Sequence, residues 1–555
     1  MQSSASDAAY QKGEKQLLPE VDQRVPVLIV GGGLAGLTTA MLLAWRGIQV
    51  MLVERHADTS VHPRARGVHL RSMELLRVAG LEQELLAADG EAFDNGVTIA
   101  IGESVMAPEF RTIASGRPFD TRDISPATYS RAGQDRVERI LRRRAAQLGA
   151  DIRFFTELVS FGDDGNGILA VVRDRKSQAL TRVRADYMVA ADGHNGRIRA
   201  ALGIGTHGHG TLSHNVSILF EADLSHINKS RGFTLYYLQN PKFTGMFVNT
   251  DVANRASISL EYDPAKESPA DYTVERCVAL VRAALGIKNI EVKILSVSPW
   301  EAYSWVADRF MLGRVLLIGD AVHTMPPTGG LGGQTAIQDG YDVAWKLALV
   351  IEGHGDAALL ATYETERKPV AELTVTRQTA NYIERMRPDR TDLNSSKIDV
   401  DIVHVAMGYR YRSPAILLEE PDDGALTEDP YLPTGRPGTR APHVVFERDG
   451  KPLSILDLIG PTFLMVAGPD ADAWARSAAE VSEKIHVPVV VYRIGYDLID
   501  KENRWTSRYG VSPSGCVLLR PDGYIAWRSR GPQNSQETIL EDVLNRVSCR
   551  TRIQT

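Results

Sequence analysis

Two glycine-rich stretches, almost three hundred residues apart, could each hold a phosphate or the polar edge of a flat ring. The first follows an apolar run and reads VGGGLAG, in which Gly31, Gly33 and Gly36 form the pattern G-x-G-x-x-G. In such a loop the first glycine permits a tight turn, the second lets the backbone approach a pyrophosphate, and the third allows close helix–strand contact. The helix that Leu34 and Ala35 are expected to begin would point its free amide groups at the phosphates.

An acidic residue stands at the distance that a dinucleotide site requires. Glu54 ends the second predicted strand, where its carboxylate could accept hydrogen bonds from ribose hydroxyls. Arg55 follows it directly and is included among the cofactor-binding candidates. A carboxylate at this position disfavours a 2′-phosphate, so the first loop by itself leaves FAD and NAD as candidate cofactors.

The second stretch, GDAVHTMPPTGGLGG, ends a short apolar strand and leads into a long predicted helix. Asp320 lies at the carboxyl end of that strand, where acids bind ribityl or ribose hydroxyls. Gly330, Gly332 and Gly333 supply bare backbone at a helix N-terminus, which suits a polar ring edge or a developing negative charge. Pro327 stiffens the approach because proline fixes φ. One extended cofactor across both loops, with ADP on the first and flavin on the second, favours FAD over NAD.

A third motif lies between the two loops, where a short strand ends at Asp192 in the stretch ADGHNGRIR. In this order the three motifs resemble the fingerprints of class A flavoprotein monooxygenases, which have the para-hydroxybenzoate hydroxylase fold. In that family the middle motif serves both FAD and NADPH, and a serine is usual where this chain has Gly196. The stretches HGHGTLSHNVSILFEADLS, LYYLQNPKFTG and MGYRYRSP further resemble aklavinone-type hydroxylases of aromatic polyketide antibiotic biosynthesis.

The resemblance assigns roles to residues outside the glycine loops. Arg64 corresponds to an arginine that contacts FAD, and Gln134 to a flavin-contacting glutamine at the start of a helix. Arg385, late on a predicted helix, corresponds to a basic residue that polarises the phenol of the substrate. Tyr236 and Tyr237 would point to opposite faces of a strand, so at most one of them faces the substrate chamber. The catalytic candidates are Arg385, Tyr236, Pro327 and Gly330, of which the last two are expected to line the reactive edge of the flavin.

The resemblance also implies a reaction. NADPH would reduce FAD, O₂ would add at flavin C4a, and the resulting hydroperoxide would pass oxygen to a phenolate-activated carbon of a polycyclic, polyketide-type aromatic substrate. Two alternatives stay open at this stage. One is a flavin monooxygenase that acts by Baeyer–Villiger or antibiotic-inactivating oxidation, and the other is a non-catalytic flavin-binding scaffold.

Composition restricts the other function classes. The 555 residues carry a formal net charge of −6, which argues against a nucleic-acid partner. The uncharged stretch 25–45 is interrupted by its glycine loop, so no membrane span is expected. Cys277, Cys516 and Cys549 have no disulfide or zinc-site spacing, and no clustered metal-ligand set occurs. These features favour a cytoplasmic protein that binds no metal, and they leave a homodimer open.

The predicted fold class is α/β, with a Rossmann-like FAD-binding domain interleaved with an antiparallel-sheet substrate domain, and a thioredoxin-like domain at the C-terminus. That last domain lacks C-x-x-C, so we expect it to be structural or dimer-forming. The predicted segments are a flexible tail (1–24), the FAD-binding domain (25–95, 126–205 and 298–420), the substrate domain (96–125 and 206–297), a linker (421–443) and the thioredoxin-like domain (444–555).

Overall fold

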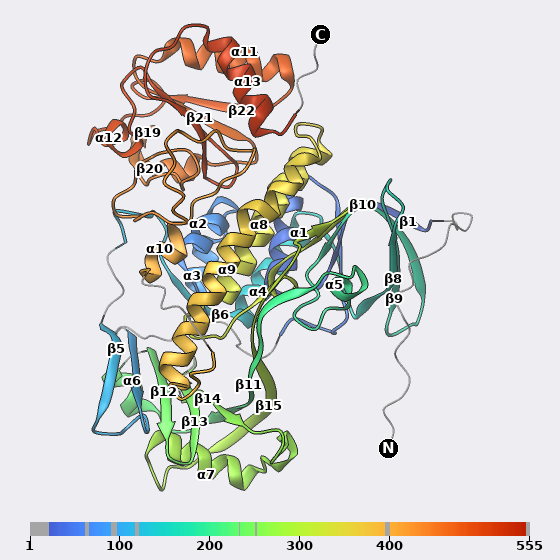
Figure 1. The fold of residues 1–555 in the computed structure, drawn as a ribbon, viewed down its shortest axis with the longest axis vertical. Helices are drawn as coiled ribbons and strands as arrows, with labels where there is room; N and C mark the ends of the chain where they lie inside the picture. The colour runs from blue at the N-terminus through green and yellow to red at the C-terminus, as the bar shows by residue number, and fades with distance from the viewer. Residues whose placement is uncertain are drawn as a thin grey trace.

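The computed structural model describes residues 21–60, 66–89, 97–116, 121–231, 233–249, 252, 254–393 and 400–550. The chain passes back and forth between two large sheets before it builds a smaller C-terminal unit (Figure 1). The C-terminal unit and the second sheet lie at opposite ends of the molecule, with the first sheet and its helices between them (Figure 1). None of the helices in the described ranges is long and apolar enough to cross a bilayer.

The first sheet is mostly parallel and has the central order β16-β17-β10-β1-β2-β7, with the β8–β9 hairpin continuing from β10. Its middle strands are continuous apolar runs because the sheet is buried on both faces there. The strands are β1 (Gln23–Val30), β2 (Val50–Glu54), β7 (Asp151–Phe154), β8 (Thr156–Asp163), β9 (Ile168–Asp174), β10 (Leu180–Ala190), β16 (Met311–Leu312) and β17 (Val315–Leu317). The helices α1 (Leu34–Trp45) and α4 (Gln134–Gln147) contact its strands, and α8 (Gly332–Ile351) packs on α1.

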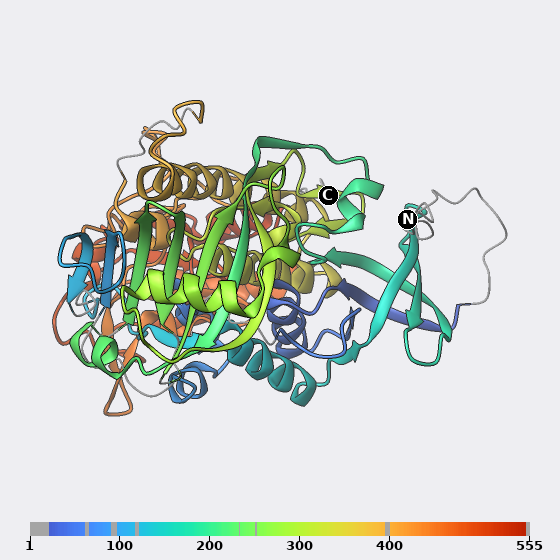
Figure 2. The same cartoon turned by 90° about the horizontal axis from the view of Figure 1, so that it is seen from below.

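The second sheet has the order β18-β15-β11-β14-β13-β12-β4-β5 and is antiparallel except where β12 pairs with β4. Figure 2 shows α7 (Val274–Leu285) lying across one face of this sheet. The long helix α9 (Ala358–Met386) packs on the other face, which is the inner face of the molecule. The strands are β4 (Val97–Gly102), β5 (Phe110–Gly116), β11 (Thr206–Glu221), β12 (Phe233–Asn240), β13 (Phe243–Asn249), β14 (Arg255–Tyr262), β15 (Lys293–Ala307) and β18 (His323–Thr324).

The C-terminal unit contains the strand order β22-β21-β23-β24, with β22 parallel to β21 and the other pairs antiparallel. This order and these directions are those of the thioredoxin fold. Its elements are β21 (Phe463–Ala467), α11 (Asp472–Ile485), β22 (Val489–Arg493), α12 (Trp505–Tyr509), β23 (Cys516–Leu519), β24 (Ile525–Ser529) and α13 (Gln536–Val547). Cys516 is free and fully buried, and burial raises the pKa of its thiol, so it stays protonated and unreactive.

The remaining elements are short and lie beside or between these three units. A small ribbon of β3 (Arg66–Val68) and β6 (Ser130–Gly133) lies between the helices of the first sheet. The others are α2 (Leu70–Val78), α3 (Glu82–Ala87), α5 (Arg197–Ala201), α6 (Ser225–Arg231), α10 (Ile402–Met407), β19 (Val445–Arg448) and β20 (Lys451–Ser454).

Candidate active site

The first glycine loop has the geometry that its sequence predicts. Gly31 has φ of +114°, and a Cβ atom there would lie 2.1 Å from the carbonyl oxygen of Ala191. A Cβ on Gly36 would lie 2.0 Å from the carbonyl oxygen of Gly31. Both positions therefore exclude any side chain, and the expected tight turn and close helix–strand contact are confirmed. Gly33 precedes α1, and the first residues of the helix, Leu34 and Ala35, are buried.

Glu54 ends β2 and closes over this loop. Its Oε2 atom accepts a hydrogen bond from the Gly32 amide at 2.6 Å, and its Oε1 atom accepts one from the His56 amide at 2.9 Å. Each carboxylate oxygen has two acceptor sites, so a ribose hydroxyl can still be accommodated. Arg55 is exposed beside it.

Asp192 contributes a buried acceptor next to the first loop. Its Oδ2 atom accepts from the Ile198 amide at 3.1 Å, whereas Oδ1 is buried and has no hydrogen-bond partner among the described residues. Burial raises the pKa of this carboxyl group, and nearby backbone amides and Arg55 partly oppose the shift. A buried acceptor without a partner is costly, so this atom is suited to a donor on a ligand. A Cβ on Gly196 would lie 2.3 Å from Oδ1, so a side chain at this position would displace the Asp192 carboxylate.

The second loop packs directly against the first. Gly319 has φ of +59°, and a Cβ on it would lie 3.0 Å from Cβ of Ala35 and 3.2 Å from Cβ of Ala336. The turn that carries Asp320 is therefore held between the first turns of α1 and α8. The side chain of Asp320 is exposed at this point, so its carboxylate is accessible to a ligand.

Beyond this turn the backbone is bare. Gly330 has φ of +65°, and a Cβ there would lie 3.6 Å from Nε2 of His69. Burial lowers the pKa of His69 to about 4, so its imidazole is neutral near pH 7. Pro327 is exposed on the approach to the loop, and α8 begins at Gly332, with Gly333 in its first turn.

A hollow lies where the two loops, α4 and the β3–β6 ribbon meet. Gln134 lines it and donates to Glu138 at 2.7 Å. Sequence reasoning missed Gln334, whose amide donates to the Gly67 carbonyl and accepts from the His69 amide, both at 2.9 Å. Its position directly after the second glycine loop was the available signal. Arg64 lies outside the described residues. The hollow is lined by Leu34, Gly67, Val68, Ala132, Gln134, Val137, Gln334 and Ile337.

The helix α9, on the inner face of the second sheet, brings Arg385 to the same loop. Its Nη1 atom donates to the carbonyl oxygen of Thr328 at 2.6 Å and to the hydroxyl of Tyr237 at 3.3 Å. The Tyr237 hydroxyl in turn donates to the Thr328 carbonyl at 3.1 Å. Among the described residues no carboxylate forms an ion pair with Arg385. This half-buried cation can therefore attract an anionic group on a ligand.

Tyr236, named above as a catalytic candidate, does not lie on the inner face of the second sheet. Tyr236 is fully buried on the opposite face of β12, in the apolar cluster formed with α7, whereas Tyr237 lies on the inner face with Tyr382 and Met386 of α9. Alternation along the strand separates the two side chains, as expected. Which of the two tyrosines lies on the inner face depends on which helix covers which face of the sheet, and this is set by tertiary packing.

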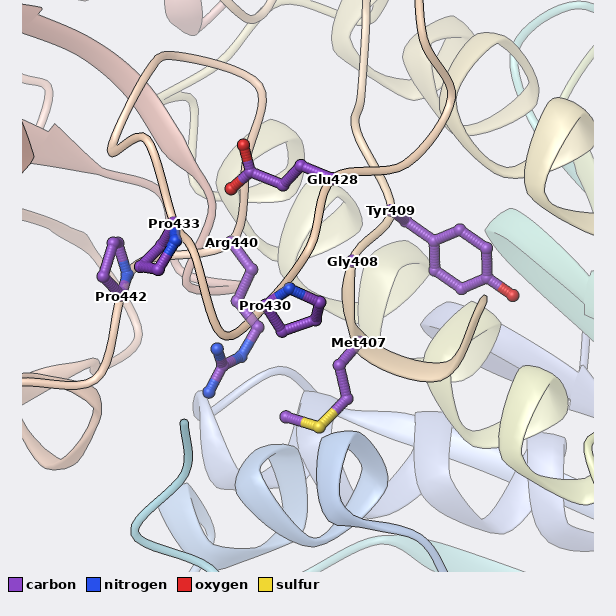
Figure 3. A pocket seen from close by; sticks show the side chains of 8 residues that line it. All are labelled: Met407, Gly408, Tyr409, Glu428, Pro430, Pro433, Arg440 and Pro442. Atoms are coloured by element: carbon purple, nitrogen blue, oxygen red, sulfur yellow. The ribbon is translucent and has the colours of Figure 1, made fainter. Parts of the chain in front are cut away.

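A second hollow lies far along the chain from the glycine loops and is not a candidate active site. It forms where the segment after α10 folds back on itself, and Figure 3 shows its lining side chains. The guanidinium group of Arg440 is already paired with Glu74, and the Glu428 amide donates to the Gly408 carbonyl at 2.8 Å. We interpret it as imperfect packing. It is lined by Met407, Gly408, Tyr409, Glu428, Pro430, Pro433, Arg440 and Pro442.

Comparison with known proteins identifies the family to which the chain belongs. Residues 24–378 match the FAD binding domain family, and residues 434–550 match the family described as aromatic-ring hydroxylase, C-terminal. The chain is an FAD-dependent aromatic hydroxylase. It is 42% identical over 540 residues to a 4-methyl-5-nitrocatechol 5-monooxygenase of Burkholderia sp, covering 95% of this chain and 98% of that one. It is 41% identical over 535 residues to an aklavinone 12-hydroxylase of Streptomyces purpurascens, covering 95% and 99%.

Solved structures agree with this family assignment. The hydroxylase superimposes with a TM-score of 0.89 on the crystal structure of a ternary complex of aklavinone-11 hydroxylase with FAD and aklavinone. That structure shares 41% sequence identity with it, and the match covers 96% of this chain and 100% of the other. The α/β fold and FAD as the cofactor, both predicted from the sequence, are thereby confirmed.

Replacing Asp320 with alanine should weaken FAD retention by the hydroxylase about tenfold or more, because a hydrogen bond to a charged group contributes ~1.5–3 kcal/mol. The loss should exceed that of Asp192→Ala. The measurement is the dissociation constant of FAD from the apoenzyme, followed by quenching of flavin fluorescence. Glu352→Ala removes an exposed acid at the other end of α8 and is the charge-matched control. Equal affinities of Asp320→Ala and this control would contradict the assignment.

Proposed function

We propose that the chain hydroxylates a phenolic, polycyclic aromatic substrate of polyketide type, with NADPH as the electron donor and O₂ as the oxidant. The balanced reaction consumes substrate, NADPH, a proton and O₂, and releases the hydroxylated product, NADP⁺ and water. The observation that supports it best is the half-buried guanidinium group of Arg385 beside the second glycine loop, which has no carboxylate partner in the part of the chain that the structure describes. A cation in this place is suited to a substrate that reacts as a phenolate.

Arg385 would act on the ionisation of the substrate. A positive charge within a few ångströms lowers the pKa of a phenol because it stabilises the phenolate. The phenolate donates electron density to its ring, and this makes the ring carbons more nucleophilic toward an electrophilic oxygen. Burial raises the pKa of Tyr237, partly opposed by Arg385, so its hydroxyl stays protonated and can orient a substrate oxygen. Arg385 and Tyr237 would thus hold and activate the same end of the substrate.

The cofactor would be held by the residues at the two loops. Bound FAD would supply electron transfer from NADPH and activation of O₂. The amides at the start of α1 would bind the pyrophosphate, Glu54 and Asp192 would accept from hydroxyl groups, and Asp320 would do so at the second loop. The bare backbone at Gly330 would lie against the flat ring without side-chain obstruction. Apolar residues on the inner face of the second sheet would exclude water from the reacting ring.

A single-ring substrate is the second candidate, because one relative of similar identity is a 4-methyl-5-nitrocatechol 5-monooxygenase. The experiment is stopped-flow measurement of NADPH oxidation with tetracyclic polyphenols, simple phenols and nitrocatechols, together with product mass and structure. We expect tetracyclic polyphenols to accelerate NADPH oxidation most and to gain one hydroxyl group. Acceleration only by nitrocatechols would favour the second candidate, and ring expansion to a lactone would show a Baeyer–Villiger reaction. No reduction of bound flavin by NADPH with any compound would indicate a scaffold.

A further inference from the structure

The turn between β23 and β24 of the C-terminal unit, residues 520–524, inserts among three helices of the FAD-binding part. The hydroxyl of Tyr341 on α8 donates to the Pro521 carbonyl at 3.0 Å. The guanidinium group of Arg71 on α2 donates to the Asp522 carbonyl at 2.5 Å. Arg520 itself is fully buried and pairs with Glu366 on α9 at 2.8 Å. One turn therefore contacts α2, α8 and α9 at the same time.

The charges around this turn form a buried set of paired carboxylates and cations. Three carboxylates, Asp342, Glu366 and Asp522, lie close enough to suggest a metal site. However, Lys346 donates to Asp342 at 2.7 Å and to Glu366 at 2.8 Å, and Arg520 pairs with Asp522. The cations therefore fill the place that a metal would take. Buried ion pairs of this kind contribute little net stability, but leaving one member unpaired is strongly destabilising, so they can fix one arrangement of the turn and the helices.

A polar chain of contacts runs from the turn to the second glycine loop. The ring of Tyr524 stacks on that of Tyr411, with centroids 4.0 Å apart and planes at 16°. The Tyr411 hydroxyl accepts from Nη1 of Arg367 at 3.0 Å, and Nε of Arg367 donates to Oδ1 of Asp339 at 2.8 Å. The other oxygen of Asp339 accepts from the Gly319 amide at 3.1 Å.

The last contact in this chain fixes the backbone next to Asp320. Oδ2 of Asp339 also lies 2.6 Å from Nε2 of His323, which follows Asp320 in the same motif. Asp339 and His323 are both buried, and burial alone would raise the pKa of Asp339, but Arg367 and His323 more than offset it and keep the pKa lowered. The carboxylate therefore stays ionised and holds both sides of the turn that presents Asp320.

An apolar contact links the same turn to the flavin-facing backbone. Leu331 stands between Gly330 and Gly332 and is buried in one cluster with Tyr411 and Tyr524. Because the side chain of Leu331 is anchored in this cluster, the backbone on either side of it is fixed as well. The C-terminal turn thus reaches both parts of the second loop, one through polar contacts and one through packing.

We propose that the C-terminal unit serves the FAD site as a positioning element, and that Tyr524 in its 520–524 turn is the residue through which it acts. In this view the thioredoxin-like unit, which has no redox pair, sets the geometry of the Asp320 turn and of the backbone around Gly330. The inference concerns FAD binding itself, so it holds whichever substrate the enzyme proves to hydroxylate.

The test compares Tyr524→Leu with Trp474→Leu in the full-length protein. Trp474, on α11, is also an aromatic residue buried in the C-terminal unit. It packs against Trp527 of β24 and takes no part in either contact chain. For each variant we would measure the melting temperature of the apoprotein, the dissociation constant of FAD well below that temperature, and the visible absorption spectrum of bound flavin. We expect a roughly tenfold or greater rise in the dissociation constant and a shifted flavin band for Tyr524→Leu only.

Two results would overturn the proposal. One is an unchanged FAD dissociation constant in Tyr524→Leu, and the other is an equal rise in both variants, which would mark a general effect of destabilisation. If Tyr524→Leu does not fold, Tyr411→Phe decides, because it keeps the stacked rings and removes only the hydroxyl to which Arg367 donates. We expect it to weaken FAD binding severalfold when the dissociation constant is measured well below its melting temperature, and wild-type binding would contradict the proposal. These measurements need neither substrate nor NADPH, so a failure of the proposed hydroxylation would leave them interpretable.

Discussion

Arg385→Met should lower the rate of hydroxylation at least about a hundredfold while FAD binding and the melting temperature stay near wild type. Methionine keeps much of the length and packing of the side chain but removes the charge and the hydrogen bonds to Thr328 and Tyr237. Removal of one electrostatic group that stabilises developing charge in a dry site costs about 10²–10³ in rate. Single-turnover measurement of product formation, separate from NADPH oxidation, shows whether the chemical step is the one that is lost.

A pH profile separates this role from a purely structural one. Without the cation the bound phenol regains a higher pKa, so phenolate forms only as the pH rises. The rate of Arg385→Met should therefore increase with pH over a range where wild type is flat. Arg377→Met is the matched control, since Arg377 lies on the same helix, is also half-buried, and donates to the Val400 carbonyl at 3.0 Å. A pH-independent loss in Arg385→Met, or an equal loss in both variants, would contradict the assignment.

The backbone of the FAD site could be predicted from the sequence because its constraints are local. Gly31 and Gly36 follow a strand at the spacing that a tight turn and a packed helix require, and the structure shows that neither tolerates a Cβ. The strands of the second sheet were recognisable from the alternation of apolar and polar residues along them. In both cases a few consecutive residues determine the conformation, so no knowledge of the rest of the chain is needed.

The side-chain contacts around the site could not be predicted, because they join segments far apart in sequence. Tyr236 and Tyr237 differ only in which face of β12 they occupy, and the face that meets α9 is decided more than a hundred residues later. Arg520 and Glu366 look like ordinary surface charges in the sequence, yet they are fully buried against each other. In the sequence, nothing distinguishes Asp339 from the other polar residues of its helix. Only the fold places it against the Gly319 amide.

Gly330→Val should uncouple NADPH oxidation from hydroxylation, with product formation reduced about tenfold or more, which corresponds to at least ~1.4 kcal/mol of barrier. Two effects act together at this position. The φ of +65° is unfavourable for valine by about 1–2 kcal/mol, and the added carbons would enter the space toward His69, 3.6 Å from the first of them. The backbone next to the cofactor would move or lose its bare surface. In our proposal, it could then no longer stabilise the negative charge that would develop there during reduction and oxygen transfer.

Gly353→Val separates strain from chemistry. Gly353 follows the C-terminal end of α8, has φ of +76° and has nothing within 4 Å of a Cβ position, so valine there brings the same conformational cost far from the loop. We expect both variants to lower the melting temperature by similar amounts and both to retain FAD, while only Gly330→Val loses product per NADPH consumed. The measurement is the ratio of hydroxylated product to NADPH oxidised, with hydrogen peroxide assayed in parallel. If this ratio stays at the wild-type value in Gly330→Val with FAD bound, the second loop only positions the cofactor, and its backbone has no part in oxygen transfer.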